Sequence, residues 1–258
     1  DVALRAAAEA ARLLESRAGA EDVREKRGRA DLVTAVDEES ERLIGDYIRA
    51  AFPDDVFIAE EFSSSAMSDR RRWVVDPLDG TVNYVHGHPF ACVSIALVDE
   101  DGPAVAVINA PFLGEVYHAV RGSGAYLNDA RIEVSRVPDL PDSLLATGFP
   151  FKAGKGDPTA YMEMVTHLVL QTHGVRRAGS AALDLAFVAS GRVDGFFEVG
   201  LSPWDIAAGI LLVSEAGGRV TGFPGDTRAP LDTGRIIASN GRIHDALTAR
   251  VASFVSRL

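Results

Sequence analysis

The sequence has a single cysteine, Cys92, which excludes an internal disulfide framework and any zinc site built from several cysteines. It also lacks an apolar run approaching the ~20 residues that span a bilayer, and no charged-then-apolar leader opens it. We therefore expect a cytoplasmic protein without a membrane partner.

Positive charge is scarce. The chain has 26 Lys and Arg against 37 Asp and Glu, which gives a formal net charge of −11. Binding to nucleic acid needs a basic footprint, so we expect no direct nucleic-acid partner. An anionic small substrate is still compatible with this balance, because a bound metal ion can be the largest charge in a site.

The usual sequence patterns of covalent catalysis and of phosphate-binding loops are missing as well. No Gly-x-Ser-x-Gly elbow occurs, and the Gly-Ser-Gly at 122–124 lacks the lysine of a P-loop. Cys92 lies in an apolar segment and is predicted to be a packed thiol. His86 and His88 are predicted to be ordinary loop residues. The sequence gives no support for a covalent serine or cysteine mechanism.

A sizeable core is nevertheless expected, because 47% of the 258 residues are hydrophobic. Apolar positions at helical spacing predict helices over 1–18 and 37–51, joined by a charged connector over 21–31. Strands are predicted after them, the last three forming an antiparallel meander: 56–59, 71–76, 91–98, 103–110 and 115–121.

The second half of the sequence alternates between helix and strand patterns. Helices are predicted over 159–173, 180–189, 203–216 and 242–256, and strands over 174–177, 193–199, 219–221 and 235–239. The first half is thus typical of an α+β fold and the second of a layered α/β fold. We expect one domain over 1–258, softly divided into a metal-binding half (1–140) and an α/β half (141–258).

Acidic residues follow apolar stretches at four separate places: Asp37, Glu60 with Glu61, Asp76 with Asp79, and Asp205. Each alone has a simple structural explanation, as a helix cap, a surface acid or a turn residue. Their recurrence at the ends of strands and loops suggests that they converge on one crevice. Hard carboxylate oxygens suit Mg²⁺, Mn²⁺ or Ca²⁺ and not zinc.

Gly80 and Thr81 add a candidate phosphate site. If the chain enters a short helix after Asp79, the Gly80 and Thr81 amides face an anion with the helix dipole behind them. The Thr81 hydroxyl can orient a water molecule, or it can serve as an ordinary helix cap.

Four stretches, in the right order, resemble the inositol monophosphatase family of Mg²⁺-dependent, lithium-sensitive phosphatases. They are DLVTAVD (31–37), IAEE (58–61), WVVDPLDGTVNY (73–84) and WDIAAGILLVSEAGG (204–218). The similarity covers essentially the whole chain, and 176–205 is especially similar to the bacterial members. The resemblance implies an αβαβα sandwich.

The resemblance also implies a role for each candidate residue. The metal ligands would be Glu60, Asp76, the Leu78 carbonyl, Asp79 and Asp205. The catalytic residues would be Asp37, Glu60 and Thr81. Phosphate and substrate would be bound by Asp79, Gly80, Thr81, Gly179, Ser180, Ala181 and Glu198. Two to three Mg²⁺ ions are implied, with Mn²⁺ as an alternative.

The implied activity is hydrolysis of myo-inositol monophosphate, and of related sugar phosphates, by a metal-activated water. The alternatives are fructose 1,6-bisphosphate or a 3′-phosphonucleotide as substrate, or a partner of the transcription machinery with a secondary phosphatase activity. A homodimer is expected by resemblance.

Overall fold

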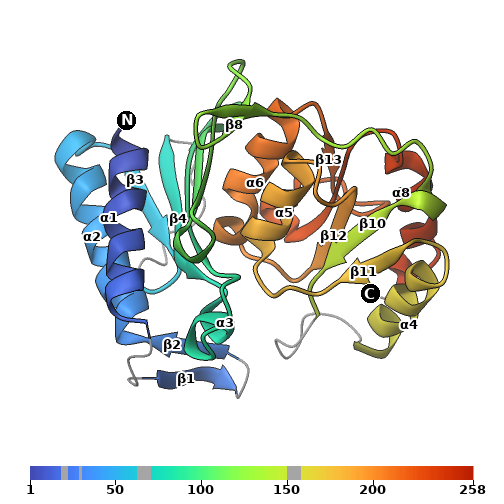
Figure 1. The fold of residues 1–258 in the computed structure, drawn as a ribbon, viewed down its shortest axis with the longest axis horizontal. Coiled ribbons are helices and arrows are strands. Elements are labelled where there is room, and N and C mark those ends of the chain that lie inside the picture. The colour runs from blue at the N-terminus through green and yellow to red at the C-terminus, as the bar shows by residue number, and fades with distance from the viewer. Residues whose placement is uncertain (19–22, 29–30, 63–70, 150–157, 258) are drawn as a thin grey trace.

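The computed structural model describes all residues except 19–22, 29–30, 63–70, 150–157 and 258. Helices and sheets alternate along the long axis of the molecule in the order helix, sheet, helix, sheet, helix (Figure 1). The αβαβα sandwich expected from the sequence is therefore confirmed. No helix in the described part of the chain is both long and apolar enough to cross a bilayer.

The first helical layer consists of α1 (Val2–Ser16) and α2 (Ala35–Ala51). Both are amphipathic and bury one stripe against the first sheet, as their helical spacing predicted. Alanines make up most of the buried stripe of α1, so this helix can approach the sheet closely. Thr34 caps α2, where its hydroxyl accepts the Val36 N–H at 3.2 Å.

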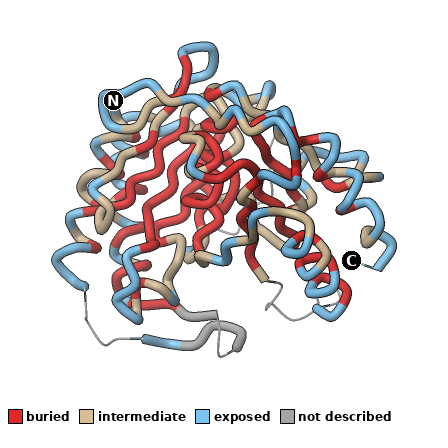
Figure 2. The backbone as a smooth tube through the Cα atoms, turned by 45° about the vertical axis from the view of Figure 1, so that its right-hand side comes forward, coloured by how far each residue is buried: buried red, intermediate tan, exposed pale blue. Residues whose placement is uncertain are grey.

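The first sheet has seven strands in the order β3-β4-β5-β6-β7-β8-β9. They are β3 (Val56–Ala59), β4 (Arg72–Asp79), β5 (Cys92–Asp99), β6 (Gly102–Ala110), β7 (Glu115–Val120), β8 (Ala125–Leu127) and β9 (Ala130–Ile132). Neighbours pair antiparallel from β4 onward, which confirms the predicted meander. The central strands are buried (Figure 2), since helices cover both faces of the sheet.

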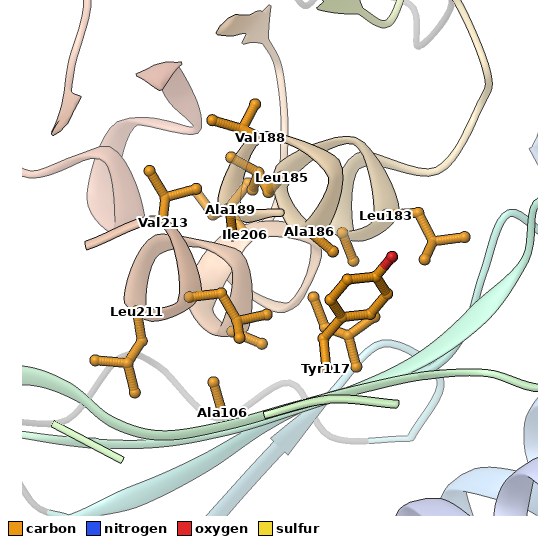
Figure 3. Packing of buried hydrophobic residues seen from close by; sticks show 14 of the residues in the cluster. Ala106, Tyr117, Leu183, Leu185, Ala186, Val188, Ala189, Ile206, Leu211 and Val213 are labelled. Carbon is orange, nitrogen blue, oxygen red and sulfur yellow. The ribbon is translucent and has the colours of Figure 1, made fainter. Parts of the chain in front are cut away.

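The middle layer consists of α5 (Ala181–Ala189) and α6 (Pro203–Glu215), which lie between the two sheets. Almost every residue of α5 is buried, as expected for a helix with apolar residues all around its axis. Figure 3 shows the side chains of both helices packed above Ala106 and Tyr117 of the first sheet.

The second sheet has the order β11-β10-β12-β14-β13. Its strands are β10 (Leu144–Thr147), β11 (Gly174–Arg176), β12 (Gly195–Val199), β13 (Arg219–Thr221) and β14 (Arg235–Ser239). β10 runs parallel to both of its neighbours, whereas β12, β14 and β13 are antiparallel. The last helical layer consists of α4 (Pro158–Val169) and α8 (His244–Ala252).

Several local predictions were wrong, among them the end of the helix predicted over 159–173, which stops at Val169. The connector predicted over 21–31 contains β1 (Val23–Gly28), which pairs antiparallel with β2 (Asp31–Thr34). The mostly charged sequence of β1 gives no alternation of apolar and polar residues. β10 was not predicted, because its short apolar run lies where a domain boundary was expected. The last helix, predicted over 242–256, ends at Ala252.

Candidate active site

Glu60 and Asp76 come from neighbouring strands of the first sheet. β3 and β4 run parallel, and their register pairs Ala59 with Val75. The next residue along each chain is an acid, so the two carboxylates emerge beside each other. The sequence placed each acid after an apolar stretch, and the parallel pairing makes them neighbours.

A β-bulge explains why Asp76 and Asp79 can act together although they are three residues apart. Asp76 pairs with Ser94 of β5 and Asp79 pairs with Cys92, so β4 carries one extra residue between them. In a regular strand, residues three apart point to opposite faces, and the extra residue of a bulge removes this mismatch. The Leu78 N–H donates to Asp76 Oδ1 at 3.0 Å and holds the bulge.

Asp205 joins these acids from the first turn of α6. The Ser202 N–H donates to Asp205 Oδ2 at 2.6 Å, which places the carboxylate at the start of the helix. The Ser94 hydroxyl donates to the Trp204 carbonyl at 3.3 Å. Because Ser94 also pairs with Asp76, this bond attaches the start of α6 to the bulged part of the sheet.

The pKa shifts show that the acids from these separate segments interact. Burial raises the pKa of Asp76 well above its usual range, and three nearby carboxylates raise it further: Glu60, Asp79 and Asp205. Burial also raises the pKa of Asp79 to about 7; Asp205 adds to the shift, and hydrogen bonds from Ser180 and Ala182 oppose it. We call Glu60, Asp76, Asp79 and Asp205 the acidic cluster.

The donor atoms of the acidic cluster are of the type that hard divalent cations prefer. Its donors are carboxylate oxygens, and the Leu78 main-chain carbonyl adds one more oxygen. A bound cation would offset the repulsion between the carboxylates that raises their pKa values. Among the residues that the structure describes, no group of three or more His, Cys, Asp or Glu side chains is placed so that it could hold a metal ion as the side chains stand. Carboxylate oxygens of the acidic cluster accept local hydrogen bonds, such as that from the Ala182 N–H to Asp79 Oδ2 at 2.8 Å. Carboxylates keep further lone pairs for a cation.

Asp37 and Thr81, two of the predicted catalytic residues, also lie together. Asp37 is buried at the start of α2, and its Oδ2 accepts the Thr34 hydroxyl at 2.6 Å and the Thr34 N–H at 2.8 Å. Its other oxygen, Oδ1, lies 3.1 Å from the Thr81 hydroxyl, which also lies 3.1 Å from the Leu78 carbonyl. The structure thus joins Asp37 and Thr81 by a hydrogen bond.

The short helix expected after Asp79 is also present, as α3 (Thr81–Val85). Gly80 precedes it with a φ of +91°, a conformation that strongly favours glycine. A Cβ at Gly80 would lie 2.8 Å from the Phe90 carbonyl oxygen. Both constraints explain why the turn after Asp79 requires glycine.

The predicted substrate residues of the second half begin beside Asp79. The Ser180 hydroxyl donates to Asp79 Oδ2 at 2.7 Å and also accepts the Leu183 N–H at 3.3 Å, as the N-cap of α5. Gly179 precedes it with a φ of +94°, and Ala181 is the first residue of the helix. The structure therefore brings the start of α5 to the edge of the acidic cluster.

Glu198 lies on β12, near a buried acid that sequence reasoning missed. That acid is Asp184 of α5; burial raises its pKa well above the usual range, and the charges of Glu198 and Asp79 raise it further. A Cβ at Gly148 would overlap the Glu198 carboxylate, so this glycine makes room for it. Asp184 is thus close enough to both Glu198 and Asp79 for their charges to act on it.

Asn83 is a second residue that sequence reasoning missed. Its side-chain amide donates to the Phe90 carbonyl at 2.7 Å and to the Ala178 carbonyl at 2.9 Å. It therefore connects α3 to the segment that leads into Gly179. Asn83 could have been identified from its position inside WVVDPLDGTVNY (73–84), two residues after Thr81.

Cys92, His86 and His88 lie where the sequence placed them, as a packed thiol and two loop residues. Cys92 is fully buried, and burial raises the pKa of its thiol well above the usual value, which disfavours the reactive thiolate. His86 and His88 lie in the exposed loop after α3. The His88 Nδ1 accepts the Phe90 N–H at 3.3 Å.

Comparison with known proteins points to one family. A sequence model of the inositol monophosphatase family matches residues 1–257. The chain is 45% identical to the Nus factor SuhB of Escherichia coli (strain K12), over 99% of this chain and 96% of that protein. An inositol monophosphatase from Anabaena (Nostoc) sp. PCC 7120 superposes with a TM-score of 0.87 at 42% identity, covering 98% of this chain and 95% of that one.

A staphylococcal inositol monophosphatase-1, solved as an inhibitory complex after soaking with LiCl, superposes with a TM-score of 0.83 at 25% identity. That alignment covers 94% of this chain and 90% of the other. Fold, motif order and sequence identity agree over nearly the full length of the chain. The chain therefore belongs to the inositol monophosphatase family, a family of metal-dependent phosphatases.

Proposed function

We propose that the chain is a Mg²⁺-dependent phosphomonoesterase that hydrolyses myo-inositol monophosphate, and related sugar phosphates, to the alcohol and phosphate. The observation that carries the proposal is the acidic cluster: carboxylates from three separate parts of the chain meet closely enough to raise the pKa of Asp76. Such a cluster is costly to bury unless cations bind there. Two or three Mg²⁺ ions, or Mn²⁺ in their place, fit its oxygen donors.

Asp37 and Thr81 act on the attacking water. The Thr81 hydroxyl donates to Asp37 Oδ1, which leaves the lone pairs of the Thr81 oxygen to accept a proton from water. As the water oxygen bonds to phosphorus, its proton passes through the Thr81 hydroxyl to Asp37. The bond from phosphorus to the ester oxygen breaks in line, and the leaving oxygen takes a proton from solvent.

The acidic cluster would hold the cations in two overlapping sets. One ion would be bound by Glu60, Asp76 and the Leu78 carbonyl. A second would be bound by Asp76, Asp79 and Asp205, and a third, weaker ion by Glu60 through water molecules. When bound, the ions lower the pKa of the attacking water and stabilise the charge that develops on the leaving oxygen. Asp76 would belong to both sets, in agreement with its interaction with every other member of the cluster.

The remaining residues orient the substrate. The amides of Gly80 and Thr81 bind phosphate oxygens, while Gly179, Ser180, Ala181 and Glu198 face the substrate hydroxyls. Polar groups on one side of the cluster favour a polyhydroxylated ring with a single phosphate. Fructose 1,6-bisphosphate and 3′-phosphonucleotides are the competing substrates.

The test is phosphate release from purified protein, measured with inositol monophosphate, fructose 1,6-bisphosphate and a 3′-phosphonucleotide. Each substrate is assayed in EDTA and after adding Mg²⁺ or Mn²⁺. We expect no turnover in EDTA, recovery with Mg²⁺, and the highest kcat/KM for inositol monophosphate. A clear preference for either alternative substrate, or turnover that persists in EDTA, contradicts the proposal.

A second candidate function is contact with the transcription machinery, because the Escherichia coli relative is named a Nus factor. The phosphatase activity would then be secondary. Co-purification of RNA polymerase subunits with wild-type protein and with Asp76→Asn tests it. Recovery of those subunits with both proteins supports a role that is independent of catalysis, and their absence with both removes this candidate.

The expected homodimer is also a proposal. Sedimentation at several protein concentrations measures the mass directly, and a mass of one chain throughout contradicts a dimer.

A further inference from the structure

We propose that Ser40 and Glu41 of α2 are positioning residues that hold two separate segments of the acidic cluster in register for cation binding. The proposal rests on the proposed metal site. Neither residue belongs to the acidic cluster. Each instead binds the main chain next to a predicted ligand.

Glu41 holds the segment that carries Glu60. Its Oε2 accepts the Glu61 N–H at 2.7 Å, and its Oε1 accepts the Phe62 N–H at 3.0 Å. Glu41 itself is only 3% exposed. Both oxygens of a buried carboxylate are thus engaged by consecutive amides, directly after the predicted ligand.

The next residue of α2 strengthens the same attachment. The Arg42 guanidinium lies over the Phe62 ring, 4.7 Å from its centroid. Phe62 is 54% exposed, so burial alone does not hold it in place. The end of this segment is therefore fixed to α2 by charge-assisted contacts and not by a hydrophobic core.

Ser40 holds the segment that carries Asp76. Its hydroxyl donates to the Pro77 carbonyl at 3.0 Å, and Ser40 is fully buried. Pro77 lies inside the bulge, between Asp76 and the Leu78 carbonyl. A bond at this carbonyl therefore restrains the part of the chain that offers two predicted ligands.

Ser40 and Glu41 share one face of α2 with Asp37. Residues three and four positions apart in a helix lie on the same side, so Asp37, Ser40 and Glu41 all face the sheet edge. Asp37 reaches Thr81, Ser40 reaches Pro77 and Glu41 reaches Glu61. One rigid helix thereby sets the spacing between the water-activating pair and both metal-binding segments.

Replacing Glu41 by glutamine changes this arrangement with little change in size. Glutamine has one acceptor oxygen, and its NH₂ group would face an amide N–H, so one of the two main-chain bonds is lost. The segment with Glu60 then keeps its sequence but loses its register against Asp76. The expected result is weaker cation binding with intact chemistry once cations are bound.

The experiment compares Glu41→Gln with Glu39→Gln. Both remove one negative charge from α2, but Glu39 is exposed and paired with Arg17. Calorimetric titration of each protein with Mg²⁺ measures affinity without turnover. We expect Glu41→Gln to weaken Mg²⁺ binding at least about tenfold, and Glu39→Gln to change it less than about twofold. The kcat at saturating Mg²⁺ should recover to near the wild-type value.

Ser40→Ala provides an independent test that removes one hydroxyl and no charge. Loss of one hydrogen bond predicts Mg²⁺ binding weakened about fivefold. Circular dichroism in EDTA establishes that each variant is folded, and if Glu41→Gln does not fold, Ser40→Ala decides the question. Wild-type Mg²⁺ affinity in folded Glu41→Gln and Ser40→Ala overturns the inference. A wild-type protein that binds no Mg²⁺ overturns the proposed function itself.

Discussion

The Thr81 hydroxyl lies 3.1 Å from Asp37 Oδ1, although 44 residues separate the two positions in the chain. The other Asp37 oxygen is occupied by the hydroxyl and the N–H of Thr34. Asp37 therefore has a fixed orientation, with one oxygen committed to the helix cap and the other to Thr81. In the proposed mechanism, Asp37 Oδ1 would be the destination of a proton that Thr81 accepts.

Removing the Thr81 hydroxyl while keeping its shape should abolish proton transfer. We expect Thr81→Val to lower kcat by about 10²–10⁴-fold, the range typical of general acid–base groups. Thr81→Ser keeps the hydroxyl and should stay within about tenfold of wild type. Steady-state phosphate release at saturating Mg²⁺ measures both, and equal losses in the two variants would show that the hydroxyl is not what matters.

Asp76→Asn should have opposite effects on activity and on stability. We expect activity to be almost lost, because Asp76 is shared by both predicted cation sets. In EDTA the melting temperature should rise by about 2–4 °C, since the buried charge and its repulsion are removed. Phosphate release and thermal unfolding in EDTA measure the two effects.

Asp101→Asn is the control for this substitution, because Asp101 is exposed at the turn between β5 and β6. It should change neither the activity nor the melting temperature. Wild-type turnover in Asp76→Asn at saturating Mg²⁺ would remove Asp76 from the proposed mechanism.

Lithium should inhibit the enzyme by occupying the second proposed cation position, as the resemblance to this lithium-sensitive family implies. We expect inhibition at millimolar Li⁺ in the presence of Mg²⁺. Sodium at the same ionic strength is the control, and phosphate release is the measurement. Equal responses to the two ions would count against this prediction.

Gly209→Ala should destabilise the middle layer. A Cβ at Gly209 of α6 would lie 2.5 Å from the Leu185 Cβ of α5, so the two helices would have to move apart. Overpacking of this kind costs about 1–3 kcal/mol in the free energy of unfolding. Ser214→Ala, on the exposed side of α6, should stay within about 0.5 kcal/mol. Urea unfolding compares them, and similar losses would contradict tight packing at Gly209.

Because of His244, the free energy of unfolding should fall in mild acid. Burial lowers the pKa of His244 from 6.5 to about 4, and the charge of Arg219 adds to the shift. Its ring nitrogens contact the hydroxyls of Ser239 and Thr221 at 2.9 and 3.1 Å. As pH falls from about 6.5 to 4, the unfolded chain takes up a proton that the folded chain refuses, which costs roughly 3 kcal/mol.

His244→Gln cannot take up this proton and should lack this contribution. Urea unfolding of both proteins between pH 7 and pH 4 gives the difference in slope. Above pH 7 the histidine is neutral in both states, so the two stability curves should run parallel there. Parallel curves over the acid range as well would show that His244 does not titrate as proposed.

The sequence predicted most helices and strands because their apolar periodicity is strong. It also identified the acids of the cluster, since each follows an apolar stretch. It could not show that β3 and β4 are parallel, and that pairing makes Glu60 a neighbour of Asp76. Nor could it show the bulge at Pro77, because a bulge is defined by register against a partner strand.

Glu41 shows a different limit. A glutamate within an amphipathic helix normally faces solvent, yet Glu41 lies on the buried face with Ile44 and Ile48. That spacing was a usable signal that the residue is buried. Its partners, the amides of Glu61 and Phe62, are main-chain groups and leave no trace in residue types. The cytoplasmic location expected from the sequence stays a prediction.

The middle layer has a consequence for the order in which the protein can assemble during synthesis. The first sheet is complete at Ile132, but α6, which covers its inner face, ends only at Glu215. At about 5–20 residues per second, a ribosome needs several seconds to make the intervening chain. During that interval the nascent sheet presents an uncovered apolar surface, so chaperone binding should concentrate on chains stalled between these two positions.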